Sequence, residues 1–445
     1  MAKKEVIQMQ IQVEKLRNTL ALLHPVIPKK PTMPVLSNVL VMDGKITASD
    51  LETAVAISLP EAHGPFLMNY RVVTDLLKFV PGYEMLTIEP NGKSIKLSWD
   101  GGAATYPVAE PQDYPDSALG DLKAEGAISG DILVEALSFA LPYCATEENR
   151  PVLCGVTVYL GSPVVVAGAD GFRMSYHALN ASYPVEKTET IIIPAHTVSI
   201  LEHLWRKAPA PVPLGDSLVS QVTAVRKLYL SLRADGKLET NKLEARFGNI
   251  QLVCTLIQGT PPDHLMLLGG FKEPIKVSFM GPELYNAVRR LRTIAHDGSG
   301  IVRLVWTYTA MTVSAQAAET GECSAEIPVL QGAVPGRIGI DIAYLDEYLA
   351  GKEGIVTLGN TNETSPAIFH YGSTPIVVIM PMAVAWDGET PKQEGAEGGS
   401  AEKPADEAPP GGGAEASTAE IAQEPETTEP EPDNKPKRRV RRKKS

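Results

Sequence analysis

The chain has 445 residues, of which 44% are hydrophobic and 21% are charged, a composition typical of a globular protein with more than one hydrophobic core. No stretch approaches the roughly 18 uninterrupted apolar residues that a membrane-spanning helix needs. The residues that follow Met1 also lack the apolar segment of a signal peptide. We therefore expect two or three domains, a cytoplasmic location and no membrane partner.

Cysteine usage and net charge restrict the chemistry further. The cysteines include no Cys-x-x-Cys pair, so we expect buried, reduced thiols and no metal or other cofactor; they are Cys144, Cys154, Cys254 and Cys323. The formal net charge of −12 argues against a nucleic-acid partner, unless Lys and Arg gather on one surface. Phosphate binding depends on the local placement of basic groups and not on their sum.

The first predicted elements are a helix and a strand, followed by the same order again. Apolar side chains recur at helical spacing at Leu16, Leu20 and Leu23. A strand-like segment follows at 34–41 (PVLSNVLV). A second helix is predicted over 70–80, and a strand is predicted around 87–89.

Residues 34–41 recur in similar form as residues 151–158 (PVLCGVTV), again after a helical stretch. That helix carries Val134, Leu137 and Leu141 at helical spacing. A further helix over 194–207 leads to a strand over 228–232. The intervening residues 208–213 (APAPVP) suit neither a helix interior nor a central strand, so we predict a surface loop there.

A third, weaker copy follows, with Leu284, Val288 and Leu291 on one helical face, a strand over 300–306, a helix over 340–349 and a strand over 355–358. The chain therefore reads as an α+β protein of three tandem domains, each with two helix-plus-sheet units. The expected boundaries are 1–123, 124–270 and 271–387. Sheets of such repeats pair edge to edge most safely in a curved or closed assembly.

Residues 388–445 differ in composition from the rest. They are acidic and rich in Pro, Gly and Ala, with almost no large apolar side chains, which predicts a disordered tail. The tail ends in eight Lys and Arg residues between Lys435 and Lys444. An electrostatic tether to DNA and a solvated segment that aids solubility are both compatible with this pattern.

Several motifs in the same order carry a family resemblance across residues 1–387. They are KPTMPVLSN (30–38), ASDLE (48–52), YPVAEPQDYP (106–115), ENRPVLCGV (148–156), AGADGFRMS (167–175) and VVIMPM (377–382). With these motifs the chain resembles the bacterial DNA polymerase III beta-subunit sliding clamps. The resemblance implies the DNA clamp fold, closed into a head-to-tail homodimeric ring with helices lining the hole.

The same resemblance implies a function and a set of partners. Sliding clamps encircle double-stranded DNA irrespective of its sequence and give the replicative polymerase processivity, without a catalytic site of their own. The implied partners are the DNA polymerase III alpha subunit, the clamp loader complex, and other polymerases and repair proteins that carry clamp-binding peptides. The implied location is cytoplasmic, at the nucleoid.

Three groups of site residues are implied by position in the family motifs. The DNA contacts would be Lys30, Lys78, Asn149, Arg150 and Arg173. The partner-peptide pocket would comprise Leu153, Ala169, Gly171, Phe172, Met174, Pro262, Leu267, Val378, Met380, Pro381 and Met382. The dimer interface would include Ala104, Tyr106, Thr293 and Ile294.

This chain departs from the family pattern at the DNA loop and in the pocket. Pro151 and Val152 stand where the family often has aromatic side chains, and Phe172 replaces a usual polar residue. From pattern alone, Met380 and Met382 also suit a strand core, whereas methionine in a pocket suits recognition of several peptides. Basic faces consistent with DNA in the hole occur on the predicted helices, at Lys15, Arg17, Arg289, Arg290 and Arg292.

Two alternatives come from other classes of protein. A hydrolase or nuclease would need convergent carboxylates, a histidine dyad or a metal cluster, but the histidines are dispersed, and His196 and His203 are two helical turns apart. No Gly-x-Ser-x-Gly elbow, phosphate loop or dinucleotide fingerprint is present. A clamp-like scaffold that binds proteins but no longer encircles DNA is the second alternative.

Overall fold

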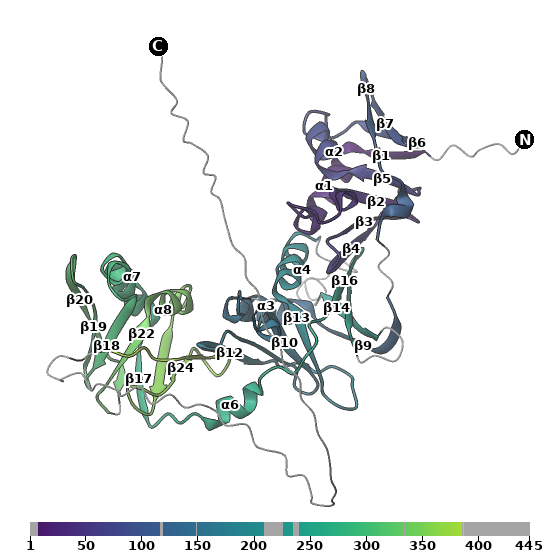
Figure 1. Ribbon diagram of the computed structural model, residues 1–445. Coiled ribbons are helices and arrows are strands. Elements are labelled where there is room, and N and C mark those ends of the chain that lie inside the picture. Colours follow the sequence, from purple (N-terminus) through teal and green to yellow (C-terminus); the bar gives the residue numbers. More distant parts are fainter. Residues whose placement is uncertain are drawn as a thin grey trace, which may run out of the picture. The chain divides into compact units, whose positions relative to one another are not determined.

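The computed structural model describes residues 8–115, 119–147, 149–208, 226–234, 240–332, 334–384 and 386. The predicted tail and most of the predicted 208–213 loop lie outside these residues, as does Glu148. Residues 8–386 belong to one compact unit that ends at Trp386 (Figure 1). Within the described part of the chain, no helix is both long enough and apolar enough to cross a membrane.

Two antiparallel sheets are built mainly from the first part of the chain. The smaller has the strand order β1-β6-β7-β8, with bounds Met9–Gln12, Met85–Asn91, Ser94–Trp99 and Gly102–Pro107. The larger has the order β5-β2-β3-β4-β16-β15-β14-β9. Its strands are, in that order, Phe66–Asn69, Asn38–Met42, Lys45–Ser49, Thr53–Ser58, Ile250–Thr255, Lys242–Phe247, Lys227–Ala234 and Asp121–Ser129.

The other two sheets contain the C-terminal strands. A nine-stranded sheet has the order β13-β10-β11-β12-β25-β24-β23-β17-β21, with bounds Glu189–Pro194, Gly155–Leu160, Val165–Ala169, Arg173–Ala178, Ile376–Ile379, Ala367–His370, Ile355–Asn360, Ile275–Met280 and Gln331–Gly332. A four-stranded sheet has the order β20-β19-β18-β22, with bounds Gly321–Pro328, Ala310–Ala317, Ile301–Trp306 and Gly336–Asp341.

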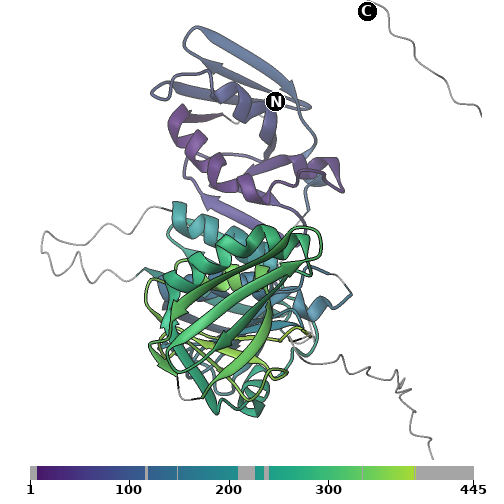
Figure 2. The same cartoon turned by 90° about the vertical axis from the view of Figure 1, so that its left-hand side faces the viewer.

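The helices of each predicted repeat pack in pairs, α1 with α2, α3 with α4, and α7 with α8. Their bounds are Val13–Leu23, Tyr70–Leu77, Gly130–Ala140, Ala195–Lys207, Gly281–Asp297 and Ile342–Leu349. Figures 1 and 2 show α7 and α8 side by side against the β18–β22 strands. A short additional helix, α6 (His264–Gly270), precedes β17.

These bounds refine the sequence predictions. The helix predicted over 340–349 begins only at Ile342, because Ile340 is a buried residue of β22. Leu141 lies beyond the end of α3, in a 3-10 turn. The segments at 34–41 and 151–158 have the same local form, since Pro34 and Pro151 each open a 3-10 turn that leads into a strand.

Two large hydrophobic clusters account for most of the core. One extends from Met9 to Leu256, and the other from Val277 to Ile379. Tyr143, which follows α3, belongs to the second cluster, so the two halves of the nine-stranded sheet share packing as well as hydrogen bonds. Among the cysteines, only Cys144 and Cys254 are buried, and burial raises the pKa of each thiol to about 12. Cys154 and Cys323 are half-buried, so the prediction of buried thiols is wrong for these two.

The packing of α3 against α4 depends on the absence of a side chain at Gly130. A Cβ atom there would lie 1.9 Å from the ring of Trp205, and that indole is held by a 2.9 Å hydrogen bond from its Nε1 to Asp131 Oδ1. Gly130→Ala should therefore lower the free energy of unfolding by about 2 kcal/mol, as overpacking does. Gly269→Ala is the matched control, because a Cβ there meets nothing within 4 Å. Equal urea midpoints for the two variants, followed by circular dichroism, would contradict this account.

Candidate functional site

A largely apolar cavity of about 200 Å³ lies where β12 meets β25. Its residues come from the β11–β12 hairpin, β25, the turn before β10, and the segment around α6. The lining residues are Leu153, Ala169, Gly171, Phe172, Arg173, Met174, Pro262, Leu267, Phe271, Val378 and Met380. Only Arg173 among them carries a charge. The cavity therefore suits apolar side chains of a ligand.

The structure brings nine of the eleven predicted pocket residues to this cavity, all except Pro381 and Met382. The backbone N–H of Met382 donates to Gly339 O at 2.9 Å, so the chain has left β25 and passes along β22 at that point. Phe271 lines the cavity but was not among the predicted pocket residues. Its position directly after Gly269-Gly270 carries no periodic signal.

The β11–β12 turn fixes the exposed aromatic ring at the cavity. Asp170 Oδ1 accepts 2.8 Å hydrogen bonds from the backbone N–H groups of Phe172 and Arg173, an Asx turn. Gly171 has φ +95°, a conformation that favours glycine. The carbonyl of Phe172 accepts from Met380 N at 2.8 Å. Phe172 is consequently held at the rim with its side chain 60% exposed.

Arg173, which is predicted as a DNA contact, lies in a network of intramolecular hydrogen bonds. Its side chain is 11% exposed, and its guanidinium donates to Asp170 Oδ2 at 2.9 Å, Glu347 Oε2 at 2.5 Å and Pro142 O at 2.6 Å. The group also lies 4.4 Å from the ring centre of Tyr344. Arg173 therefore ties the cavity wall to α8, with each of its three guanidinium nitrogens donating to a protein oxygen.

Helix α6 is anchored by polar groups on its inner side. Asp263 caps its first turn by accepting from Met266 N at 2.9 Å. His264 is 1% exposed, and its Nδ1 lies 2.8 Å from Tyr159 Oη, which also donates to Pro262 O at 3.1 Å. Burial lowers the pKa of His264 to about 4, so the imidazole is neutral at pH 7. This network positions the cavity residues Pro262 and Leu267.

The other predicted DNA contacts are exposed. Lys30 lies in the segment before β2, and Lys78 directly follows α2, where it forms a 2.7 Å ion pair with Asp75. Asn149 and Arg150 precede the 3-10 turn that leads to β10. A Cβ added to Gly171 would lie 3.0 Å from the Arg150 guanidinium, so Arg150 is a neighbour of the cavity as well.

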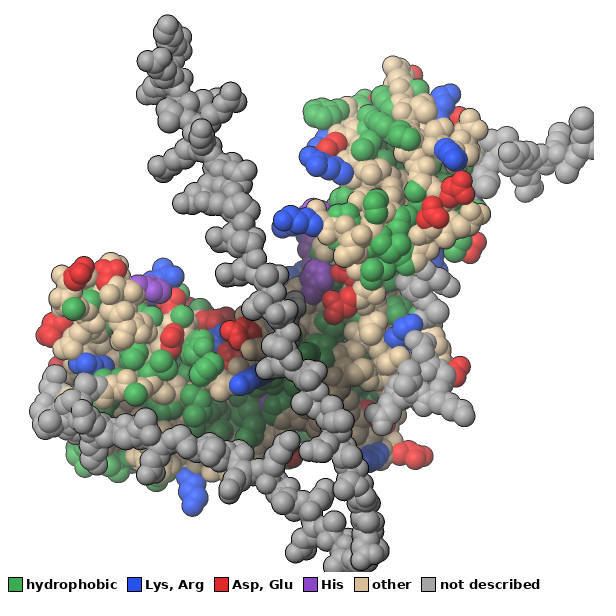
Figure 3. Space-filling model, in the orientation of Figure 1, with side chains coloured by type: hydrophobic (Ala, Val, Ile, Leu, Met, Phe, Trp, Pro, Cys, Tyr) green, Lys and Arg blue, Asp and Glu red, His purple; other side chains and the backbone are tan. Residues whose placement is uncertain are grey.

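The helices differ in their basic content. Helix α7 carries Arg289, Arg290 and Arg292, but neither α3 nor α8 contains Lys or Arg. On α1, Arg17 donates to the carbonyls of Leu77 and Val80 and is therefore a structural group. The face drawn in Figure 3 shows basic and acidic side chains interspersed. The predicted basic residues of α7 are thus exposed, whereas of the two predicted on α1 only Lys15 is exposed.

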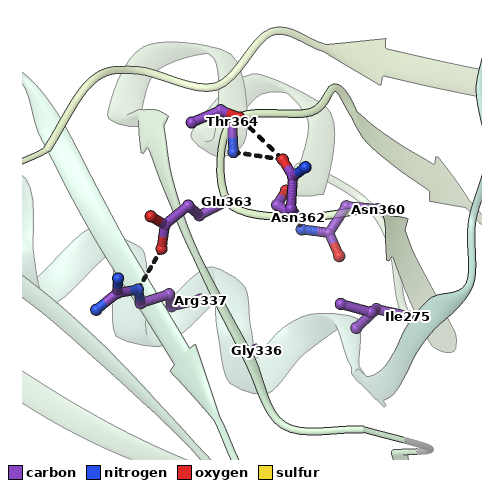
Figure 4. Close-up of a pocket in the computed structure, with 7 residues that line it drawn as sticks. All are labelled: Ile275, Gly336, Arg337, Asn360, Asn362, Glu363 and Thr364. Atoms are coloured by element: carbon purple, nitrogen blue, oxygen red, sulfur yellow. Dashed lines mark hydrogen bonds and ion pairs between the residues drawn. The ribbon is translucent and has the colours of Figure 1, made fainter.

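Most residues that line a second cavity, of about 420 Å³, have polar side chains (Figure 4). Arg337 of β22 and Glu363 of the β23–β24 turn face one another there as an ion pair. Thr364 donates to Asn362 Oδ1 through its backbone N and its hydroxyl. These contacts stabilise the turn between β23 and β24.

Across the described ranges, no group of three or more His, Cys, Asp or Glu side chains is arranged to hold a metal ion.

The comparisons with known proteins all point to one kind of protein, and together they cover most of the chain. A family model described as DNA polymerase III beta subunit, central domain, matches residues 131–263. The beta sliding clamp of Pseudomonas aeruginosa is 23% identical over 389 residues, covering 84% of this chain and 98% of that protein. The beta sliding clamp of Caulobacter vibrioides is 21% identical over 354 residues, which cover 76% of this chain and 89% of that protein.

Solved structures give the same result for the fold. The DNA polymerase III subunit beta of P. aeruginosa matches with a TM-score of 0.74 at 21% identity, over 85% of this chain and 100% of that chain. A P. aeruginosa clamp bound to griselimycin matches with a TM-score of 0.72 at 22% identity, over the same shares. The architecture is therefore the α+β DNA clamp fold. Residues 131–263 match the central-domain model of the DNA polymerase III beta subunits, and the chain is similar to the beta sliding clamps over most of its length.

The Arg173 network can be tested by removing its charge. Arg173→Met should lower the free energy of unfolding by about 2 kcal/mol, because it leaves Asp170 and the Pro142 carbonyl without their partner. Hydrogen exchange should rise in β12 and β25. Arg71→Met is the control, since that side chain is 92% exposed and its ion pair with Asp75 is 4.0 Å long. Unchanged exchange in β12 of Arg173→Met would show that the network is dispensable.

Proposed function

We propose that this protein is a sliding clamp, a ring around double-stranded DNA that confers processivity on the replicative polymerase and has no catalytic site of its own. The observation that carries the proposal is the full-length similarity to beta sliding clamps, together with an apolar cavity built from family motifs at 153, 167–175 and 377–380. The proposed partners are the DNA polymerase III alpha subunit, the clamp loader, and other polymerases and repair proteins that bind through peptides.

The cavity is the proposed site for those peptides. An extended segment places alternate side chains on the same side, so two apolar residues separated by one position can enter together. Met174 and Met380 are unbranched and adapt to different side chains. Arg173 also lines the cavity, and its charge is compensated by Asp170 and Glu347.

The proposed ring closes through two sheet edges. Strand β8 ends one four-stranded sheet, and β20 ends the other. Pairing β8 of one copy with β20 of the next would join them into a continuous sheet, head to tail. Ala104 and Tyr106 lie on β8, and Thr293 and Ile294 lie on α7, which packs along β20. The geometry of one chain is compatible with this arrangement.

The proposed domains follow the strand pairing. The first boundary fits best before Asp121 instead of at 123, because β9 (Asp121–Ser129) is one strand that pairs with β14 along its length. The second fits at 270, where α6 ends. Sequence-independent DNA contacts are proposed for Lys30, Lys78, Asn149 and Arg150, whose exposed side chains can donate to phosphate oxygens.

Retention on DNA tests the ring. The protein is loaded onto nicked circular plasmid with a clamp loader, and its release is followed by gel filtration before and after the plasmid is linearised. A closed ring stays on the circle and is lost from the linear form, because only free ends allow it to slide off. Equal release from both forms would indicate ordinary surface binding and support the scaffold alternative.

Ring closure can be tested at one backbone group. The Val108 N–H donates to Lys93 O at 2.9 Å, and alternation along an antiparallel pair then directs the Thr105 N–H away from β7. Thr105→Pro should weaken dimerisation about tenfold or more while leaving the β7–β8 ladder intact. Thr105→Ala keeps the N–H group and is the control. Sedimentation velocity over a dilution series measures both, and a dimer of undiminished affinity in Thr105→Pro would rule out β8 as the interface.

A further inference from the structure

Lys352 places its ammonium group among three aromatic rings. Its Nζ lies 5.4 Å from the ring centre of Phe139, 5.4 Å from that of Tyr348 and 5.5 Å from that of Tyr371. The rings belong to α3, to α8 and to the residue directly after β24, and we call them the aromatic cage. Within the described part of the chain, Nζ forms no hydrogen bond or ion pair with another residue. The contacts of this ammonium with the described residues are therefore cation–π contacts.

An unmodified ammonium suits the aromatic cage poorly. The group has three N–H donors and is strongly hydrated in water, whereas the ring faces offer no oxygen or nitrogen acceptor. Burial accordingly lowers the pKa of Lys352, which raises the fraction of the side chain present as a nucleophilic free amine. A methylated ammonium keeps its charge and has fewer donors to satisfy, and aromatic rings bind such groups well.

The distances from Nζ to the rings also leave room for methyl groups. A methyl carbon bonded to Nζ would lie about 1.5 Å from it. If that carbon pointed at a ring centre 5.4 Å from Nζ, it would lie about 3.9 Å from the centre, within the optimal range for contact between carbon atoms. An acetyl group would instead remove the charge and add a carbonyl that needs a hydrogen-bond donor. The aromatic cage therefore favours methylation over acetylation.

We propose that Lys352 is a lysine methylation site whose modified ammonium is bound by the aromatic cage. The methyl donor is a sulfonium compound, used by a methyltransferase. Nζ first gives up a proton to water, and its lone pair then attacks the methyl carbon. A new N–C bond forms, and the C–S bond breaks with its electron pair left on sulfur, so that a charged methylammonium and a neutral thioether result. The inference is independent of the proposed clamp function.

The position of Lys352 allows an enzyme to reach it. Its neighbours Gly351 and Glu353 are exposed, and no hydrogen bond to a described residue has to break when the side chain swings out of the aromatic cage. The backbone stays fixed, because Lys352 N donates to Leu349 O at 3.0 Å. A Cβ atom at Gly281 would also lie only 2.4 Å from Lys352 O. Methylation can therefore take place at the surface, and the modified side chain can return to the cage.

Mass spectrometry of the protein isolated from the cells that make it tests the modification. Cleavage after glutamate releases residues 348–353 (YLAGKE), in which Lys352 is the only lysine. Recombinant protein treated with formaldehyde and a borane reductant supplies a dimethylated standard. The fragment should carry one or more methyl groups. A fragment found only in the unmodified or acetylated form would overturn the proposal.

Calorimetry on the full-length recombinant protein tests the aromatic cage. Reductive methylation, carried to completion at Lys352 as judged by the 348–353 fragment, converts lysine to dimethyl-lysine. Lys352→Arg keeps a cation among the rings that this reaction leaves unmethylated. Methylation should change the Tm of the wild type by about 2 °C more in the stabilising direction than that of Lys352→Arg, because only the wild type gains a methylated ammonium in the cage.

The control variant is Lys93→Arg, which removes an exposed lysine from the turn between β6 and β7. Its Tm should respond to methylation as that of the wild type does. Equal responses of the wild type and Lys352→Arg would mean that the aromatic cage gives a methylated ammonium no advantage, and would overturn the proposal.

Discussion

The pairing of β12 with β25 is the constraint on which the candidate site depends. Met174 lies opposite Val378, and Arg173 lies opposite Ile379, in an antiparallel register. Because side chains alternate between the faces of a strand, a slip of one residue would move Met174 away from the cavity and bring a neighbour in its place. The composition of the cavity is therefore a property of this register, and any ligand that occupies it contacts both strands.

Arg173 secures that register from the other side of the sheet. It belongs to β12, yet two of its partners, Glu347 and Tyr344, belong to α8. Directing Arg173 at a DNA phosphate would leave Asp170, 14% exposed, with a charge and no cation. The desolvation cost of such a group exceeds what one solvent-exposed phosphate contact returns. A link between cavity and helix is thus the role that the electrostatics favour.

The same residue shows what the sequence could predict. Apolar residues at helical spacing located α1, α3 and α7, the other three paired helices were predicted to within a few residues of their bounds, and the family resemblance indicated nine of the residues that line the cavity. Both signals are local. The role of Arg173 depends on Glu347, and the direction of the chain after Met380 depends on Gly339. These partners are distant in sequence, so they played no part when position in the family motifs indicated DNA for Arg173 and the pocket for Met382.

Uneven basic content among the helices bears on how the proposed ring holds DNA. Lys78 is exposed and pairs with Asp75 at the surface, where an ion pair contributes little to stability. Exchanging Asp75 for a phosphate therefore costs little, in contrast to the exchange at Arg173. Helices α3 and α8 offer no cation at all. Binding through a few such exchangeable contacts is weak at every position along the duplex. Weak, sequence-independent contacts of this kind allow a ring to slide.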